Sequence, residues 1–203
     1  TLGGASGVVV IGLGAEASAQ GSIPEVSNSV VIGTQSYANG LESIAIGRRA
    51  GWYIDGSFPV APNSQNIGIG VEAGSHIFGS QNIALGVKAG EKVFGDGNSA
   101  IGRGAGRWVR GNFNTAHGVE AGGYLSAGSS YNTAMGYQAG INLQGSYNVG
   151  VGYLAGASTT GDNSIAMGLY AGMQVVGDNN TALGSSAGRD VSGWSNLAVG
   201  SAA

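Results

Sequence analysis

Few residues in this chain have side chains that could do covalent or acid–base chemistry. The sequence holds two histidines, His76 and His117, and no cysteine. Neither histidine has a serine or a pair of carboxylates at the spacing of a catalytic motif, and the 11 acidic residues are scattered. An activated nucleophile, a glycosidase carboxylate pair and a calcium-binding acidic repeat are therefore all missing. We expect no enzyme activity, no metal and no cofactor.

Short Gly-x-Gly motifs occur, as in Gly68-Ile69-Gly70 and Gly102-Arg103-Gly104. A nucleotide-binding loop of this kind needs a following helix whose N-terminus meets the phosphate. No helical pattern follows these motifs, so we interpret their glycines as structural.

The composition argues against two further classes of partner. The net charge is −3 and no run of Lys or Arg exists, so the basic patch of a nucleic-acid binder is missing. Gly or a polar residue interrupts every apolar stretch before it reaches the roughly 18 residues of a membrane span, so we expect no direct membrane insertion by this segment. The chain opens at Thr1 without a Met, which indicates a fragment or a processed product. We expect any signal, anchor or assembly domain to lie outside it.

A short repeat runs along the whole chain. A small residue, an apolar residue and a glycine recur as a triplet, and seven of the eleven intervals between triplet glycines are 16 residues. These glycines are Gly12, Gly33, Gly47, Gly70, Gly86, Gly102, Gly118, Gly136, Gly152, Gly168, Gly184 and Gly200. The apolar-small-apolar alternation before each glycine has period two, which predicts strands rather than helices. Such a unit cannot bury its apolar side alone, so neighbouring units must stack and pair their strands in parallel.

Each unit is predicted to form one coil with two strands of four or five residues and two corners. A second apolar residue follows each triplet glycine by seven residues, as at Val93 and Val109, and marks the second strand. A glycine two residues later, as at Gly95 and Gly145, supplies one sharp corner, and the Ala-Gly pair of each unit supplies the other. Longer intervals predict loop excursions near 13–30, 48–66 and 119–131. We therefore expect one repeat domain over residues 1–203, with about twelve coils.

An asparagine precedes most triplets at a fixed distance. It recurs at Asn66, Asn82, Asn98, Asn114, Asn132, Asn148, Asn180 and Asn196. In a stack these side chains lie above one another, and their amides can bond from one coil to the next. Ion coordination by this column would need carboxylates that these positions do not have. We predict a structural asparagine ladder.

Three of the units carry a resemblance to known proteins. Asn28-Ser-Val-Val-Ile-Gly33, Glu42-Ser-Ile-Ala-Ile-Gly47 and Asn163-Ser-Ile-Ala-Met-Gly168 resemble the head repeats of YadA-like trimeric autotransporter adhesins. The unit from Asn132 to Gly136 also resembles repeats of bacteriophage tail fibres. The resemblance covers nearly the whole chain and implies an all-β fold, a left-handed parallel β-roll (a β-solenoid) whose three copies associate around a common axis. It also implies exposure on a bacterial cell surface or a virion, and binding to a host receptor, matrix or glycan.

A homotrimer is also expected from the coils themselves. Coils with Ala and Gly at so many positions enclose little volume, while apolar residues alternate on more than one row. The apolar residues that do not fit inside a coil can be buried against symmetry-related copies, whichever row faces the axis. His117 stands where the other units have Ile, Leu, Met or Val. It is either a packed histidine of an apolar row or a residue of the trimer axis, where three copies would hold an anion, a water or a metal.

Aromatic side chains recur at equivalent places in successive units. One column stands one residue before the asparagine, and another follows the triplet glycine directly or one place later. The first column is Phe113, Tyr131 and Tyr147, and the second is Tyr137, Tyr153 and Tyr170. Such columns offer faces to sugar rings or protein partners, or they stack only to stabilise adjacent coils. We take all six as candidate ligand-binding residues.

The long interval between Gly47 and Gly70 is the segment richest in aromatic residues. Loops on rigid scaffolds often carry function, although this one could instead latch neighbouring coils or subunits. Further candidate ligand-binding residues here are Trp52, Tyr53, Phe58, Arg48 and Arg49. Together with Lys88, Arg103, Arg107 and Arg110, the two arginines could attract an acidic glycan or form a solvated face.

Two functions follow from these observations. The first is an extracellular trimeric fibre or adhesin segment that binds a host-cell surface receptor, matrix or glycan. The second is a passive spacer of a phage tail fibre or surface fibre, with recognition carried by another domain. An ice-binding face is disfavoured, because the residue after the ladder asparagine is too mixed, as Ile83, Ser99 and Thr115 show.

Overall fold

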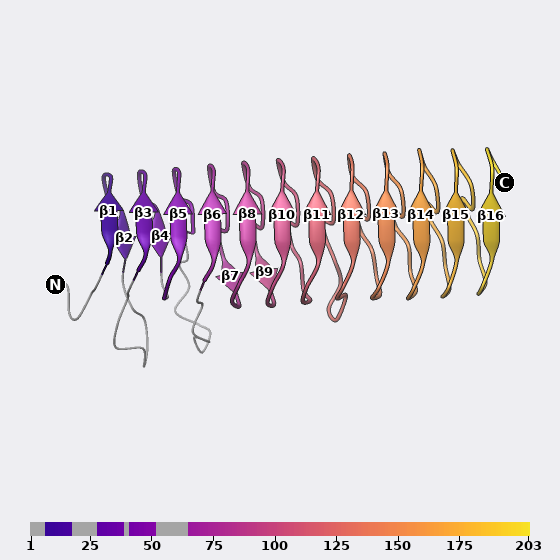
Figure 1. The fold of residues 1–203 in the computed structure, drawn as a ribbon, viewed down its shortest axis with the longest axis horizontal. Helices are drawn as coiled ribbons and strands as arrows, with labels where there is room; N and C mark the ends of the chain where they lie inside the picture. Colours follow the sequence, from indigo (N-terminus) through magenta and orange to yellow (C-terminus); the bar gives the residue numbers. More distant parts are fainter. Residues whose placement is uncertain (1–6, 18–27, 39–40, 52–64) are drawn as a thin grey trace.

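The computed structural model describes residues 7–17, 28–38, 41–51 and 65–203. Over this part of the chain the protein is a parallel β-solenoid, whose turns are spaced about 16 residues apart (Figure 1). Successive turns lie side by side along one long axis, and the chain runs from one end of the rod to the other. None of the described residues is helical, in agreement with the period-two pattern.

One 12-stranded parallel sheet forms a face along the rod. Its strands are β1 (Val9–Ile11), β3 (Val30–Ile32), β5 (Ile44–Ile46), β6 (Ile67–Ile69), β8 (Ile83–Leu85), β10 (Ser99–Ile101), β11 (Thr115–His117), β12 (Thr133–Met135), β13 (Val149–Val151), β14 (Ile165–Met167), β15 (Thr181–Leu183) and β16 (Leu197–Val199). Each strand pairs in register with the equivalent strand of the next turn, so that Ala100 lies between Ala84 and Ala116. Each has three residues, fewer than the four or five expected.

The predicted second strand is only partly formed. It is regular where β2 (Glu16–Ala17) pairs with β4 (Tyr37–Ala38) and β7 (Ile77–Phe78) pairs with β9 (Val93–Phe94). Further along the rod single bridges replace it, such as the one between Gln144 and Thr160. The expectation of two strands in every coil is therefore wrong. A left-handed residue and the corner glycine leave only two residues between them, as Asn142 and Gly145 do, so this second strand has at most two residues in the described turns.

Small side chains fill the interior. The alanine in the middle of the main strand and the alanine of the Ala-Gly pair are both buried, as Ala116 and Ala121 show. A column of larger side chains closes the opposite wall, and it consists of Ile77, Val93, Val109, Leu125 and Leu143. These are the second apolar positions of the repeat, which are confirmed as core. The space left inside is about 10 Å³ beside this column and about 30 Å³ in the stretch from Leu143 to Ala198, which is room for a few waters at most.

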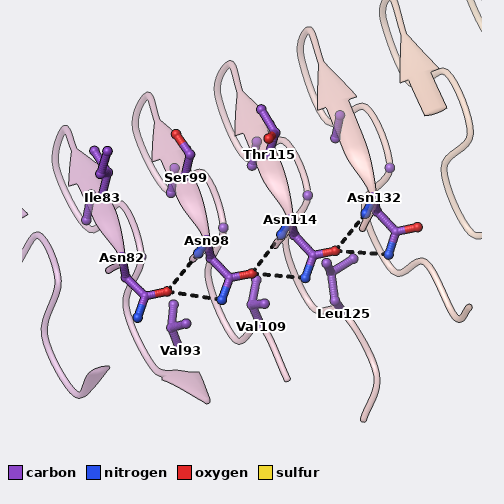
Figure 2. Close-up of a pocket in the computed structure, with 18 of the residues that line it drawn as sticks. Asn82, Ile83, Val93, Asn98, Ser99, Val109, Asn114, Thr115, Leu125 and Asn132 are labelled. Atoms are coloured by element: carbon purple, nitrogen blue, oxygen red, sulfur yellow. Dashed lines mark hydrogen bonds between the residues drawn. The ribbon is translucent and has the colours of Figure 1, made fainter. Parts of the chain in front are cut away.

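The asparagine ladder is confirmed, and it lies inside the rod (Figure 2). The Asn98 Oδ1 accepts hydrogen bonds from the backbone N–H and the Nδ2 of Asn114, both at 3.0 Å. The Asn98 Nδ2 donates to the Gly111 carbonyl at 2.9 Å and to the Asn82 Oδ1 at 3.1 Å. One amide therefore satisfies two buried backbone groups and also joins two neighbouring side chains.

Serine occupies the ladder where the sequence pattern shifts. The backbone N–H of Asn180 donates to the Ser164 Oγ at 3.2 Å. Asn163, one place earlier, instead adopts a left-handed turn conformation with φ 57°. The short serine hydroxyl does not serve the facing Gly177 carbonyl, which accepts from the Asn180 Nδ2 at 2.8 Å. Serine thus keeps the acceptor function of the ladder, but its hydroxyl donates to the nearby Asp162 carbonyl at 3.4 Å instead of to the opposite wall.

The corner glycines are needed for two reasons. Gly145 has φ 129°, and a Cβ at this position would collide with the carbonyl oxygen of Gly161 in the next turn. Glycine is thus needed at this corner for its positive φ, as the sequence predicts, and also because the next turn lies too close for a side chain. Residues with side chains also take left-handed conformations at other turns, such as Trp108 and Tyr124 with φ 57° and 59°. The sequence analysis assigned corners to glycine and missed these residues.

Gly145→Ala is expected to destabilise the rod by roughly 3 kcal/mol or more, because strain at positive φ adds to displaced backbone. Gly128 provides a matched control, since it has φ 85° but a Cβ there would meet nothing within 4 Å. Gly128→Ala is expected to cost only about 1 kcal/mol. Denaturant unfolding followed by circular dichroism measures both losses. Equal losses would mean that the close approach of the turns contributes nothing.

Asn114→Ala is expected to destabilise the rod by about 2 to 5 kcal/mol, because two buried backbone groups lose their partners. These groups are the N–H of Asn132 and the carbonyl of Ser129. Asn114→Ser retains an acceptor, as Ser164 does, and is expected to cost about half as much. Thermal unfolding gives the totals, and faster amide exchange should be confined to adjacent turns. The role of the acceptor would be refuted by equal losses in the two variants.

Candidate functional site

The main sheet turns an apolar face outward. From β3 to β15 the middle residue of each strand is buried and the two flanking residues are partly or largely exposed, as in β14, where Ile165 is 40% and Met167 46% exposed. These outward residues, which we call the apolar strip, are Val, Ile, Leu or Met apart from Ser99, Thr115, His117, Thr133 and Thr181. Monomeric proteins rarely leave such a continuous strip uncovered. It is the surplus apolar row that the sequence predicted, and it lies on the outer face of the main sheet.

The two aromatic columns exist as predicted and flank the apolar strip, one at each end of the strands. Phe113, Tyr131 and Tyr147 precede β11, β12 and β13, and successive ring centroids are 5.3 and 5.0 Å apart. Tyr137 and Tyr153 follow β12 and β13, and their centroids are 5.0 Å apart. The stack brings together residues that are 16 or 18 positions apart in the sequence.

The rings of the first column cover one another's faces. The planes of Tyr131 and Tyr147 are parallel, and the Phe113 ring occupies the space that a Cβ at Gly97 would need. The outer edges stay accessible, since Tyr131 is 49% and Tyr147 57% exposed. The faces of these rings are therefore occupied by stacking between turns and are not available to a ligand. A ligand alongside this column would meet ring edges and hydroxyl groups.

The second column ends in a different arrangement. Tyr170 meets Tyr153 edge-on at 5.4 Å, and the Arg189 guanidinium lies 5.9 Å from the Tyr170 centroid. Desolvation, followed by the charges of Tyr170 and Tyr137, raises the pKa of the Tyr153 hydroxyl above its usual value. The Tyr153 hydroxyl is therefore a neutral hydrogen-bond donor at and above neutral pH.

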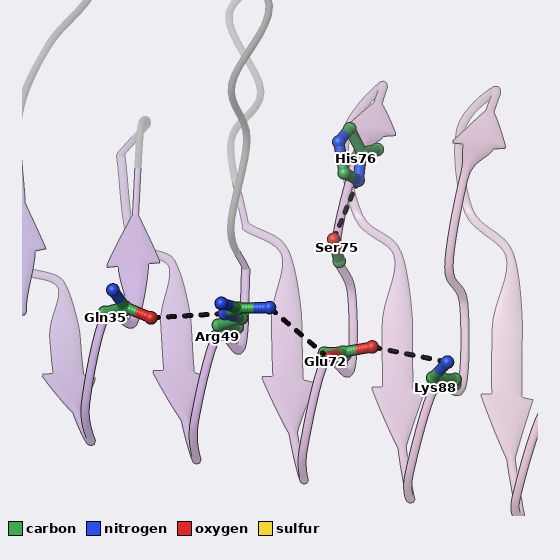
Figure 3. Close-up of polar contacts among 6 residues, drawn as sticks. All are labelled: Gln35, Arg49, Glu72, Ser75, His76 and Lys88. Carbon is green, nitrogen blue, oxygen red and sulfur yellow. Dashed lines mark hydrogen bonds and ion pairs between the residues drawn. The ribbon is translucent and has the colours of Figure 1, made fainter.

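Charged and polar side chains form a column at the turns that follow the main strands, two residues after the triplet glycines (Figure 3). The Arg49 Nε donates to the Gln35 Oε1 at 3.1 Å, and the Arg49 Nη1 lies 3.9 Å from the Glu72 Oε1. The Lys88 Nζ lies 3.5 Å from the other Glu72 oxygen. Two of the predicted basic residues therefore share one carboxylate of the same chain.

Two other basic residues also have partners. The Arg107 Nε lies 3.2 Å from the Glu91 Oε2, and the Arg110 guanidinium lies 5.7 Å from the Phe94 ring centroid. Arg48 and Arg103 are exposed. The structure thus distributes the basic residues over several columns, and three of the six, Arg49, Lys88 and Arg107, form ion pairs with Glu72 or Glu91.

The remaining candidates fall into two groups. Trp52, Tyr53 and Phe58 lie outside the described residues. His117 lies on the apolar strip, half-buried, between Ile101 and Met135 of the neighbouring strands. The other histidine, His76, has its Nδ1 2.7 Å from the Ser75 Oγ (Figure 3).

A second polar ladder, which the sequence analysis missed, runs beside the first aromatic column. The backbone N–H of Ser146 donates to the Asp162 Oδ1 at 2.7 Å, and that of Asp162 donates to the Asp178 Oδ1 at 2.9 Å. These carboxylates were interpreted as scattered. The 16-residue spacing of Asp162 and Asp178 could have revealed them as members of one column.

Two kinds of feature are absent from the residues that the structure describes. None of them forms a helix that is long and apolar enough to cross a membrane. Nor does this part of the chain gather three or more His, Cys, Asp or Glu side chains where a single copy could hold a metal ion.

Comparison with known proteins gives one match. Neither a curated protein nor a solved structure matches the chain significantly. The family model of the YadA head domain repeat matches twice, at residues 27–50 and 155–171. The first match contains β3 and β5, and the second contains β14. Each match therefore includes main strands with their triplet glycines, and the chain carries YadA-like head repeats.

Proposed function

We propose that this chain is a segment of an extracellular trimeric fibre of the adhesin type, carried on a bacterial cell surface or a virion. In this proposal three left-handed rods cover their apolar strips around a common axis, and the outer surface binds a host-cell surface receptor, matrix or glycan. The observation that carries the proposal is a continuous exposed apolar strip on a chain with YadA-like head repeats.

The thin core explains why further copies are needed. The interior holds alanine, glycine and one column of larger side chains, such as Val93 and Leu143, so the outward residues of the main strands have no room inside. Three copies related by rotation bury three identical strips in one closed assembly. Parallel rods also keep the outer surfaces of all three copies available to a ligand.

The proposed ligand contacts lie on this outer surface, and the fold supports binding rather than catalysis. Aromatic edges and hydroxyl groups recur over several consecutive turns beside the polar columns, which suits an extended ligand running along the rod. Among the residues that the structure describes, the proposed ligand contacts are Phe113, Tyr131, Tyr137, Tyr147, Tyr153, Tyr170, Arg48 and Arg49. Trp52, Tyr53 and Phe58 are proposed as further contacts.

The alternative function is a passive spacer of a phage tail fibre or surface fibre, with recognition carried elsewhere. Two observations favour it. The ring faces of Tyr131 and Tyr147 are occupied by stacking, and Glu72 forms ion pairs with both Arg49 and Lys88. Because these rings and charged groups already contact one another, a ligand that binds them would gain less binding free energy.

Light scattering of the purified chain is expected to give close to three times its mass of 19.9 kDa. The double variant Ile165→Glu, Met167→Glu is expected to dissociate the trimer, because it buries carboxylates in an apolar contact. Gln144→Glu, an exposed position outside the main sheet, is the control that should remain trimeric. A wild-type chain that stays monomeric and folded at micromolar concentration would refute the proposed assembly.

Tyr137→Ala and Tyr147→Ala are expected to weaken adhesion to host cells or arrayed glycans by roughly three- to tenfold, as loss of one aromatic contact does. Phe78→Ala is the matched control, since Phe78 stacks on Phe94 at 4.6 Å but lies on β7, outside the main sheet. It should lose stacking without losing adhesion. Wild-type protein that binds no host surface would favour the spacer.

A further inference from the structure

The apolar strip is interrupted at one place along the rod. Four of the five polar residues that it contains from β3 to β15 lie on the consecutive strands β10, β11 and β12. These residues are Ser99, Thr115, His117 and Thr133. Ser99, Thr115 and Thr133 are register partners in one row of the sheet. His117 stands in the adjacent row, and together the four residues form a polar island.

The side chains of the polar island lack hydrogen-bond partners among the residues that the structure describes. Its four side chains are half-buried, and in the part of the chain that the structure describes none of them makes a hydrogen bond or an ion pair. The register neighbours of His117, Ile101 and Met135, can offer the imidazole no strong donor or acceptor. Covering the strip would bury an unsatisfied imidazole, which is costly. Groups from outside the chain must therefore complete this site.

The next step rests on the trimer proposed above. Rotation about an axis parallel to the rod keeps every residue at its own height, so the three His117 rings would meet at one level. A neutral imidazole has one acceptor nitrogen, and three such lone pairs facing one point repel each other unless an electrophile lies between them. Three imidazoles with an added water form a familiar donor set for a four-coordinate divalent metal.

We infer that three His117 side chains, one from each copy, bind one divalent transition-metal ion such as Zn²⁺ at the trimer axis. The second ring nitrogen of a metal-bound histidine is ordinarily held by a hydrogen-bond acceptor, which fixes the tautomer. No hydrogen bond joins His117 to Ser99, Thr115 or Thr133 within one described chain, so in this proposal a hydroxyl group of the polar island on a neighbouring copy supplies the acceptor. Ile101 below and Met135 above separate this level from the rest of the strip. A single copy offers one imidazole, so the site exists only in the assembly.

Calorimetric titration of the chelator-treated, full-length chain with Zn²⁺ tests the inference. The wild type is expected to bind about one Zn²⁺ per three chains and to unfold at a higher temperature when loaded. His117→Met places in β11 the residue that β12 has at the same position, so the variant should remain trimeric and bind no Zn²⁺. His76→Gln removes the other histidine, whose Nδ1 lies 2.7 Å from the Ser75 Oγ, and should leave binding unchanged.

Three results would overturn this site. A wild-type trimer that binds no Zn²⁺ would refute the metal and leave the proposed assembly intact. Binding that survives His117→Met, or one Zn²⁺ per chain that disappears with His76→Gln, would assign the metal to other residues. A wild-type chain that light scattering finds monomeric with and without Zn²⁺ would refute the trimer and the site together.

Discussion

The backbone groups inside a coil this thin cannot reach water, and at the turns they have no partner in the sheet. The asparagine ladder meets this need, because each amide bonds the N–H of the next turn and a carbonyl on the opposite wall, as Asn98 does with Asn114 and Gly111. A side chain of one length permits one separation between turns. Two additional residues separate Asn114 from Asn132, yet their ladder bond is still 3.0 Å, so the additional length lies outside the column.

The same constraint determines where large side chains can go. Turns held this close leave room for alanine and glycine inside, and for one column of residues such as Val93 and Leu143. The larger apolar residues of the main strands therefore point outward, and a single copy exposes Ile165 and Met167. The exposed strip is thus a consequence of how the interior is satisfied.

Features that repeat with the period of the coil could be predicted from the sequence. The parallel stack, the ladder and the aromatic columns all follow from residues 16 apart, such as Tyr131 and Tyr147. The left-handed turn residues could not be predicted, since Trp108 and Tyr124 share no chemical feature that marks a turn. The outward face could not be assigned either, because the alternation around Ala116 has the same pattern whichever side is buried. Arg49 and Glu72 are 23 residues apart, because the turn between them is longer than the usual 16 residues. Their pairing could therefore not be predicted from the regular spacing.

Repetition also indicates where function should be sought. In a solenoid each turn contacts only its neighbours, so an outward side chain can change at little cost to the stack, whereas an inward one disturbs two adjacent turns. Departures on the outer surface are therefore the informative ones. The aromatic columns occupy only some turns, and the polar island occupies three strands of an otherwise apolar strip. Neither is needed to form the rod, because β3 and β5 pair in the same register without any residue of the aromatic columns or the polar island. The stack does not require the aromatic columns or the polar island. We therefore attribute these features to contacts with partners outside the single chain.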